Sequence, residues 1–383
     1  MTGLAETIMP KPASRRDFLQ WMGGAALASP VAAPLFLRGG RAQTGPERRI
    51  GYCIVGLGRI SMGEFMPGVR RSRSSKLVAL VSGHRDKAER MADQYQTPRR
   101  NIYDYEHYDA IAENPEIEAV YIALPNRMHA EYTIRAAQAG KHVLCEKPMA
   151  TSAADCELMI DACRKANRKL MIAYRCQYEP TNLRAVKLVR DGQIGRLQVI
   201  ESAFGFNIAP GEWRLNKKMA GGGPMVDVGI YGLQACRYLS GEEPTEVRAN
   251  WSVIDRDGRF NEVEENLVWT MQFPSGVLAS CSTSYGSDAG NYYRGVGPKG
   301  WVQVEPAFSY EGLRFKASIH GSALIDEPTD DPSPRQFTRE ADHFAECILE
   351  DKQPKTPGQE GLRDQKIIEA IYRSCARGHP VKL

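Results

Sequence analysis

Apolar positions follow one pattern in the first part of the chain and another in the second. From Arg49 to about Tyr174, short apolar runs alternate with segments in which apolar residues recur at helical spacing. This alternation is typical of a parallel sheet covered by helices. It predicts strands at 50–55, 77–82, 119–124, 142–145 and 170–174, and helices at 87–95, 128–139 and 153–167. Asp86 and Ser152 stand where helix N-caps are expected, and Gly140 stands where a helix should end.

After Tyr174, apolar and polar residues alternate along much of the chain, which is typical of strands with one buried face. The predicted strands are 198–206, 246–253, 264–273, 277–285 and 301–305, with a hairpin turn at 273–276 and helices at 181–191, 337–349 and 361–376. We therefore expect an α/β domain over residues 49–175. An α+β domain with a large, mostly antiparallel open sheet should follow over 176–383, and residues 43–48 form a short polar arm before both.

Composition sets limits on what the chain can bind. It has 383 residues, 42% of them hydrophobic, which is enough for two domains with full cores. The formal net charge of +4 is too small to favour nucleic acid or a membrane surface as a partner. Nine cysteines are scattered without a C-x-x-C pair, so we expect no disulfide framework and no metal site.

The amino-terminal segment has the features of an export signal. The run Ser14-Arg15-Arg16-Asp17-Phe18-Leu19 is followed by an apolar stretch over 21–37. Twin-arginine signals send folded proteins out of the cytoplasm through a dedicated export machinery. The stretch is short and interrupted by Gly and Pro, so we expect a signal peptide over 1–42 and no stable membrane association. The mature protein would then lie in the periplasm.

The first predicted strand leads into a glycine-rich loop, Gly56-Leu57-Gly58-Arg59-Ile60-Ser61. The first glycine permits a tight turn and the second lets the backbone approach a pyrophosphate, while the small third residue, here Ser61, allows close packing of helix on strand. The following helix N-terminus offers free N–H groups to phosphates. This position in a β-α-β pattern predicts a Rossmann dinucleotide-binding domain.

The end of the second predicted strand distinguishes the two nicotinamide dinucleotides. NAD enzymes usually carry an acidic residue there for the ribose 2′-hydroxyl. This chain has Ser82 and Gly83, and then Arg85 and Lys87, which together with Arg59 can bind a 2′-phosphate. Asp86 is interpreted as a helix cap. We therefore expect NADP.

Two further motifs carry groups suited to proton transfer. Lys147 follows Glu146 at the end of a predicted parallel strand, on the edge where open α/β folds bind their ligands. Asp227 and Tyr231 are four residues apart, so on a helix they share one face. These three residues are the candidate catalytic set.

At these motifs the sequence is similar to the glucose–fructose oxidoreductase/inositol dehydrogenase family, above all to its glucose–fructose oxidoreductase branch. The similarity extends over nearly the whole chain after the arm. It is carried by Gly56-Leu57-Gly58, Ala79-Leu80-Val81-Ser82-Gly83, Ile102-Tyr103-Asp104-Tyr105, Glu146-Lys147-Pro148-Met149-Ala150, Tyr174-Arg175, Trp213-Arg214-Leu215 and Asp227-Val228-Gly229-Ile230-Tyr231-Gly232. Many relatives have His where this chain has Tyr231.

The resemblance implies roles for individual residues. Tyr231 would be the acid/base, Lys147 would favour its phenolate, and Asp227 would orient the sugar or Lys147. Besides the glycine-rich loop and Ser82, Gly83, Arg85 and Lys87, the implied cofactor contacts are Tyr105, Leu124, Pro125, Asn126, His129, Glu146, Lys147, Arg175, Trp213 and Arg214. The implied sugar contacts are Lys147, Arg175, Tyr178, Arg214, Asp227 and Tyr231, with Tyr285, Tyr292 and Tyr293 as weaker candidates.

Export and a dinucleotide site together indicate a particular kind of chemistry. Outside the cytoplasm there is no pool of nucleotide to exchange with, so NADP should stay tightly bound. We expect a ping-pong reaction in which an aldose is oxidised to its aldonolactone and a second sugar is reduced to a polyol. The resemblance also implies a homodimer or homotetramer. Three alternatives stay open: a sugar or inositol dehydrogenase with exchangeable cofactor, an NAD-dependent glycosidase, and a non-catalytic sugar-binding protein.

Overall fold

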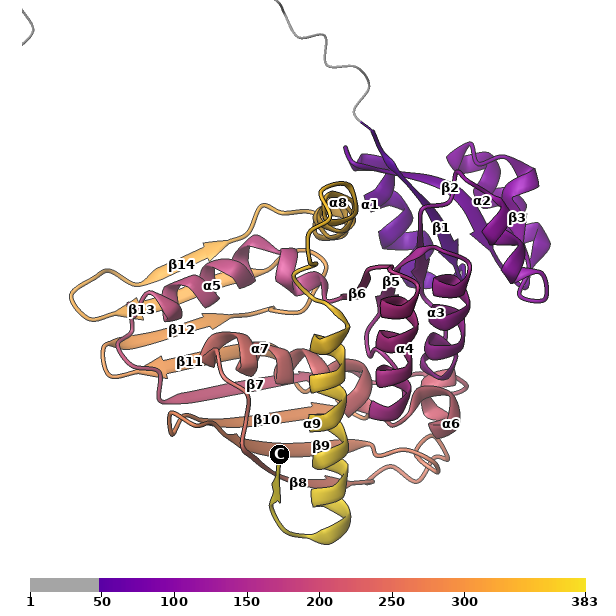
Figure 1. Cartoon of the computed structure of the whole chain (residues 1–383). Helices are drawn as coiled ribbons and strands as arrows, with labels where there is room; N and C mark the ends of the chain where they lie inside the picture. The colour runs from indigo at the N-terminus through magenta and orange to yellow at the C-terminus, as the bar shows by residue number, and fades with distance from the viewer. Residues whose placement is uncertain (1–47) are drawn as a thin grey trace, which may run out of the picture. The chain divides into compact units, whose positions relative to one another are not determined.

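A parallel sheet of six strands forms the first part of the computed structural model, which describes residues 48–383. The predicted signal peptide, and most of the arm, lie outside these residues. The strands are β1 (Ile50–Val55), β2 (Ser75–Val81), β3 (Ile102–Tyr103), β4 (Ala119–Ile122), β5 (His142–Glu146) and β6 (Leu170–Ala173), in the order β3-β2-β1-β4-β5-β6 (Figure 1). All residues of β1 and β4 are buried, as expected of central parallel strands covered on both faces. The direction of strand order changes between β1 and β4, which is where such sheets bind ligands.

Four helices, α1 (Met66–Arg71), α2 (Arg85–Tyr95), α3 (His129–Gln138) and α4 (Ala153–Lys165), connect these strands. Ser152 caps α4 as predicted, because its hydroxyl accepts a hydrogen bond from the Asp155 amide. The prediction for Asp86 was wrong: α2 begins two residues earlier than predicted, its N-cap is His84, and Asp86 pairs with Arg90 on the helix surface.

The second sheet has nine strands in the order β14-β13-β12-β11-β7-β10-β9-β8-β15. They are β7 (Val199–Gly205), β8 (Glu246–Ser252), β9 (Asn266–Gln272), β10 (Leu278–Ser284), β11 (Asn291–Gly297), β12 (Gly300–Val304), β13 (Arg314–Ile319), β14 (Ile325–Pro328) and β15 (Val381–Lys382). The β7–β10 pair is parallel and the others are antiparallel. The predicted fold class is therefore confirmed.

The sequence pattern missed β3, β11, β13, β14 and β15. Strand β11 reads NYYRGVG, in which two glycines interrupt the alternation, and β14 is largely polar. Their pairing depends on the neighbouring strands rather than on their own periodicity.

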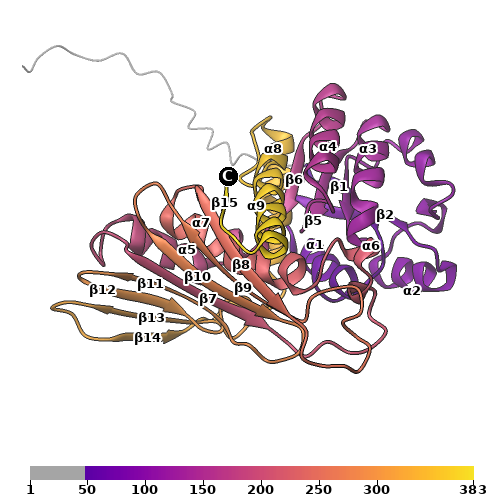
Figure 2. The ribbon, with the colours of Figure 1, turned by 90° about the horizontal axis from the view of Figure 1, so that it is seen from below.

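Helices α5 (Pro180–Arg190), α7 (Ile230–Ser240) and α9 (Gly358–Arg377) lie on one face of the nine-stranded sheet (Figure 2). In the described part of the chain no helix covers the opposite face. Helix α8 (Arg335–Leu349) instead packs beside α1, where Phe337, Ala341 and Phe344 join the core beneath β1 (Figure 1). The Rossmann layer therefore includes a helix that lies more than a hundred residues beyond its last strand.

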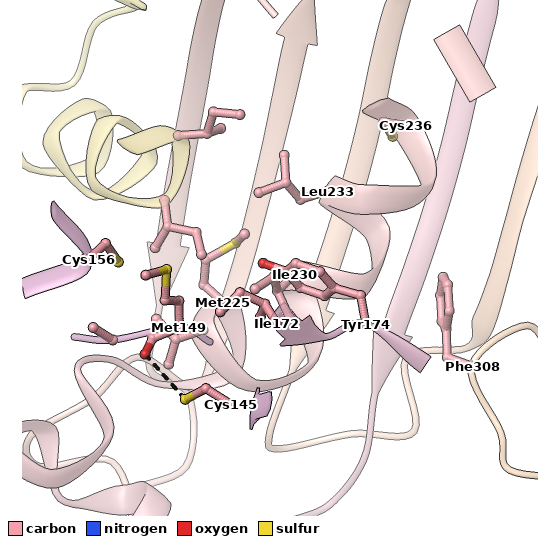
Figure 3. Close-up of a cluster of buried hydrophobic side chains, with 14 of the residues drawn as sticks. Cys145, Met149, Cys156, Ile172, Tyr174, Met225, Ile230, Leu233, Cys236 and Phe308 are labelled. Atoms are coloured by element: carbon pink, nitrogen blue, oxygen red, sulfur yellow. Dashed lines mark hydrogen bonds between the residues drawn. The ribbon is translucent and has the colours of Figure 1, made fainter. Parts of the chain in front are cut away.

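The two sheets share one continuous core. Cys145 and Ile172, from β5 and β6, lie in the same cluster as Ile230 and Leu233 from α7 (Figure 3). This packing fixes the start of α7 relative to the end of β5. None of the helices formed by residues 48–383 is long and apolar enough to cross a membrane.

Candidate functional site

The glycine-rich loop forms a cradle that fits a dinucleotide pyrophosphate. Gly56 has φ +95°, and a Cβ there would lie 2.5 Å from the carbonyl oxygen of Ala123. A Cβ at Gly58 would meet no atom within 4 Å, so the space above this residue is open to a ligand. The Ser61 hydroxyl closes the loop by donating to the Gly56 carbonyl oxygen over 2.6 Å, where a π-helical turn begins. Leu57 is buried beside this turn, and Ile60 packs against the same core.

The residues predicted to select NADP gather at the end of β2. The Ser82 hydroxyl accepts from the His84 amide, and the neighbouring Gly83 faces the ring of Tyr105. Lys87 reaches back to the loop after β1, where its Nζ donates to the Leu57 carbonyl oxygen over 3.4 Å. Arg85 pairs with Glu89 at the surface. A serine and a lysine, with the Asp86 carboxylate turned toward Arg90, fit a 2′-phosphate better than a free 2′-hydroxyl.

His129 ties together the loops that follow β4 and β5. Its Nδ1 lies 2.9 Å from the Pro148 carbonyl oxygen and its Nε2 lies 2.9 Å from that of Leu124. Burial lowers the pKa of His129 despite these two acceptors, so the neutral ring donates to one of them. His129 thus fixes the position of the loop that contains Leu124 and Pro125. Asn126, in the same loop, donates to the Ala220 carbonyl oxygen over 2.8 Å.

Lys147 and Asp227 meet at the end of β5. The Lys147 Nζ donates to the Asp227 backbone carbonyl over 2.6 Å and to its Oδ1 over 3.2 Å. Asp227 Oδ2 accepts from the Tyr285 hydroxyl over 2.8 Å and lies 3.0 Å from Arg214 Nε. Burial alone would raise the pKa of Asp227, but Lys147, Arg214 and Tyr285 together hold it well below its usual range. Asp227 is therefore an ionised centre with both oxygens occupied, which suits it to orienting Lys147 rather than to accepting a proton.

Tyr231 lies near two cations. The Lys147 Nζ is 4.7 Å from the centroid of its ring, and the Arg175 Cζ is 4.9 Å from it. Burial raises the pKa of Tyr231, and the strongest opposing influence is Arg175. Asp227 and Tyr231 lie close together as their spacing predicts, although Asp227 is in a π-helical turn, Met225–Gly229, and Tyr231 is in the first turn of α7. Such turns are often found at functional sites.

Arg175 is held by backbone and side-chain acceptors. It donates to the Phe308 carbonyl oxygen over 2.5 Å and to Gln336 Oε1 over 2.8 Å, and its guanidinium also lies over the ring of Tyr310. These contacts place it behind Tyr231, where it acts on the phenol through its charge. Tyr178 is not brought to the Lys147–Asp227 pair, because its hydroxyl lies in the core 3.3 Å from Thr356 Oγ1.

Glu146 and Trp213 adjoin this centre, because each is next in the chain to one of its residues, Lys147 and Arg214. The Glu146 carboxylate accepts from the Tyr121 hydroxyl over 2.6 Å, and burial raises the pKa of Glu146. The Trp213 ring stacks with the Arg214 guanidinium at 4.7 Å. The structure therefore places Trp213 where it supports the arginine that pairs with Asp227.

The structure adds residues that sequence reasoning missed. The Glu264 carboxylate accepts from the amides of Gly223 and Met225 and from the Tyr372 hydroxyl, and so caps the turn that carries Asp227. A Cβ at Gly222 would lie 2.2 Å from the Tyr372 hydroxyl, which explains a glycine there. The three glycines before Pro224 were the only sequence signal of this close approach.

Comparisons with known proteins place the chain in a family. Residues 50–174 match the oxidoreductase family with an NAD-binding Rossmann fold, and residues 182–303 match the GFO/IDH/MocA C-terminal domain. A D-xylose 1-dehydrogenase [NADP(+)] of Haloarcula marismortui is 31% identical over 349 residues, which cover 89% of this chain and 95% of that protein. The chain belongs to the GFO/IDH/MocA oxidoreductase family. The resemblance predicted from its motifs is thereby confirmed.

Solved structures agree with this assignment. The crystal structure of an aldose-aldose oxidoreductase from Caulobacter crescentus, complexed with glycerol, is 46% identical with a TM-score of 0.85. The match covers 88% of this GFO/IDH/MocA chain and 100% of that chain. A levoglucosan dehydrogenase in complex with NADH and levoglucosan is 21% identical with a TM-score of 0.77 and covers 88% of this chain and 99% of that one. At that identity the similarity concerns the fold alone.

Proposed function

We propose that this chain is an exported sugar oxidoreductase that keeps NADP bound and transfers hydrogen from an aldose to a second sugar. The observation that carries the proposal is the meeting of Lys147, Asp227 and Tyr231 at the carboxyl edge of the Rossmann strands. The 46% identity to an aldose-aldose oxidoreductase, over the whole of that chain, supports this pair of substrates.

The reaction is balanced by two half-reactions. The first sugar loses a hydride from C1 and a proton from its anomeric hydroxyl, giving the aldonolactone. The second sugar gains a hydride at its carbonyl carbon and a proton at its carbonyl oxygen, giving the polyol. The bound dinucleotide supplies the hydride acceptor and donor.

The chain itself handles the proton. Tyr231 would receive it from the anomeric hydroxyl and return it to the carbonyl oxygen of the second sugar. Because burial raises the pKa of Tyr231, the phenolate needs the positive charges of Arg175 and Lys147 close by. Asp227 holds Lys147 in place, and its own proton plays no part.

NADP rather than NAD is supported by Ser82 and Lys87 at the end of β2 and by the NADP(+) named for the D-xylose 1-dehydrogenase relative. Export is supported by the twin-arginine motif at Arg15 and Arg16. A nucleotide that leaves the cytoplasm with its protein has no pool to exchange with, which favours permanent retention and a ping-pong cycle.

A homo-oligomer is supported by the bare face of the nine-stranded sheet. Three apolar side chains on this face, on the adjacent strands β7, β10 and β9, are between 38% and 53% exposed: Val199, Leu278 and Val268. An apolar patch of this kind on a water-soluble surface favours burial against a second copy. Light scattering of the Val268→Glu variant should give a smaller particle than the wild type.

The test is NMR of the purified protein with glucose and fructose and no added nucleotide. The proposal expects equal amounts of gluconolactone (or gluconate) and a polyol. If protein that carries nucleotide forms no product, fructose is replaced by a second aldose such as xylose. No lactone and no polyol from any pair would overturn the proposal.

A second candidate, an NADP-dependent sugar dehydrogenase with exchangeable cofactor, is favoured by the D-xylose 1-dehydrogenase relative. It requires added NADP⁺ in stoichiometric amount, and it releases NADPH that absorbs in solution. The same NMR sample, with and without NADP⁺, separates the two functions.

A further inference from the structure

Residues 207–227 run across the carboxyl edge of the Rossmann sheet and contact three of its loops. Glu212 pairs with Arg59, after β1. The Ala220 carbonyl oxygen accepts from Asn126, after β4, and Asp227 pairs with Lys147, after β5. Strands β1, β4 and β5 are neighbours in the sheet, so the three contacts follow the edge in order. Dinucleotides bind along this edge in folds of this type.

The outermost contact joins the nucleotide loop directly to this segment. Arg59 comes immediately after Gly58, and its guanidinium lies 2.6 Å from Glu212 Oε1. The Arg59 side chain is 81% exposed, whereas that of Glu212 is 23% exposed. Glu212 is thus the fixed partner, and Arg59 reaches across to it.

Glu212 also belongs to a row of alternating charges. Its Oε2 lies 3.8 Å from Arg214, whose Nε lies 3.0 Å from Asp227, and Asp227 in turn pairs with Lys147. The row begins at the phosphate loop and ends beside Tyr231. A change at Glu212 can therefore act on the nucleotide at one end and on the proton-transfer centre at the other.

We propose that Glu212 is a positioning residue that fastens segment 207–227 to the phosphate loop and slows release of the dinucleotide. A nucleotide lying along the edge would have the Arg59–Glu212 pair across it, and this pair must open before the ligand can leave. The inference rests on the proposed function only in taking a dinucleotide as the ligand. An exposed ion pair is worth up to about 1 kcal/mol, so its loss should speed release about fivefold.

One alternative role of Glu212 predicts the opposite change in the rate of nucleotide release. If Arg59 leaves Glu212 to bind a phosphate of the nucleotide, Glu212 competes with the ligand. Removing its charge would then slow release, or leave it unchanged. The direction of the change therefore decides between the two accounts.

The experiment measures NADPH release by stopped-flow fluorescence, after loading each protein with NADPH and displacing it with excess NADP⁺. The proteins are the wild type, Glu212→Gln, Arg59→Gln and the double variant. Glu327→Gln is the matched control. Glu327 lies on strand β14, far from the nucleotide loop, and also forms a short exposed ion pair with an arginine, Arg184 of α5. We expect about fivefold faster release from Glu212→Gln, unchanged release from the control, and no further acceleration when Glu212→Gln is added to Arg59→Gln.

Release from Glu212→Gln at the wild-type rate or slower would overturn the proposal, as would additive effects of the two substitutions. In urea, the free energy of unfolding should be lower for Glu212→Gln than for the wild type by no more than about 1 kcal/mol, the value of the lost ion pair, which separates positioning from a loss of fold. Because every protein is loaded before the measurement, fast release from the wild type would refute permanent retention alone, and the ratio of rates would still test Glu212. Failure of the wild type to bind NADPH, when it also carries no dinucleotide as purified, would refute both proposals.

Discussion

The two ends of the candidate site are built in different ways. At the proton-transfer end, the side chains of Lys147 and Asp227 are only 12% and 15% exposed, and Asp227 has three side-chain partners. At the nucleotide end, Arg85 is 61% exposed, and Lys87 makes a single long hydrogen bond. One end is organised by the protein, and the other is left for a charged ligand to complete. Groups that stabilise charge during a reaction act best when already in place, whereas a phosphate can order its own binding residues.

The largest effect should come from Tyr231→Phe. The ring and its packing against Phe204 and Phe308 are kept, and only the hydroxyl is lost. We expect kcat to fall by about 10² to 10⁴, the usual contribution of an acid/base group, with nucleotide content unchanged. Product formation by NMR and absorbance of the bound nucleotide measure the two quantities. A kcat within tenfold of the wild type would show that Tyr231 is not the acid/base of the reaction.

Asp227→Asn should destabilise the proton-transfer end of the site, because it removes the negative charge at the centre of that end. Removing one partner of a buried pair costs about 3–5 kcal/mol, because Lys147 and Arg214 lose their counter-ion. Since the folded-state pKa of Asp227 lies below its unfolded value, the carboxylate stabilises the wild type fully above about pH 4. That contribution disappears as the pH falls through the folded-state pKa.

Urea unfolding at pH 7 and at pH 3 checks this, and the difference in stability between wild type and variant should shrink at the lower pH. A constant difference would mean that Asp227 acts through packing rather than charge.

A smaller effect is expected at the nucleotide end. Lys87→Ala removes one charged hydrogen-bond donor and should weaken NADP binding by about 10- to 100-fold, with little change for NAD. Arg90→Ala is the control, since Arg90 lies on the same helix and pairs only with Asp86 among the described residues. Calorimetric titration of nucleotide-free protein with both nucleotides measures the change. Equal losses for NADP and NAD would place Lys87 away from the 2′-phosphate.

The smallest effect should be that of Tyr285→Phe. It removes one hydrogen bond to Asp227, about 1 kcal/mol, while Arg214 stays on the same oxygen. We expect a loss of about fivefold in kcat and no change in nucleotide affinity. Tyr108→Phe is the control, because it also removes a buried tyrosine hydroxyl, one that donates to the Tyr132 carbonyl oxygen instead of to Asp227. A change in nucleotide affinity instead would show that the two ends are coupled more tightly than their contacts indicate.

Much of the first domain could be predicted from local pattern. Strand β1 and the loop at Gly56 and Gly58 were found because a buried parallel strand is a continuous apolar run and the turn needs glycine. The N-cap at Ser152 was predicted for the same kind of local reason. Strands β11 and β14 could not be predicted, because their pairing comes from neighbouring strands. The periodicity of residues 337–349 predicted helix α8, but it did not predict that this helix packs against α1.

The sequence alone determined the family and the Rossmann loop, since both rest on residue types at short spacing. It also predicted the set Lys147, Asp227 and Tyr231, from two separate motifs and the family resemblance. Only the tertiary structure decided what surrounds them. It brought Tyr285, 58 residues along the chain, onto Asp227, and it placed Arg175 behind Tyr231. It also turned Tyr178 into the core and set Glu212 against Arg59. Contacts between distant segments depend on how the two sheets pack, and such packing leaves no period in the sequence that could be read in advance.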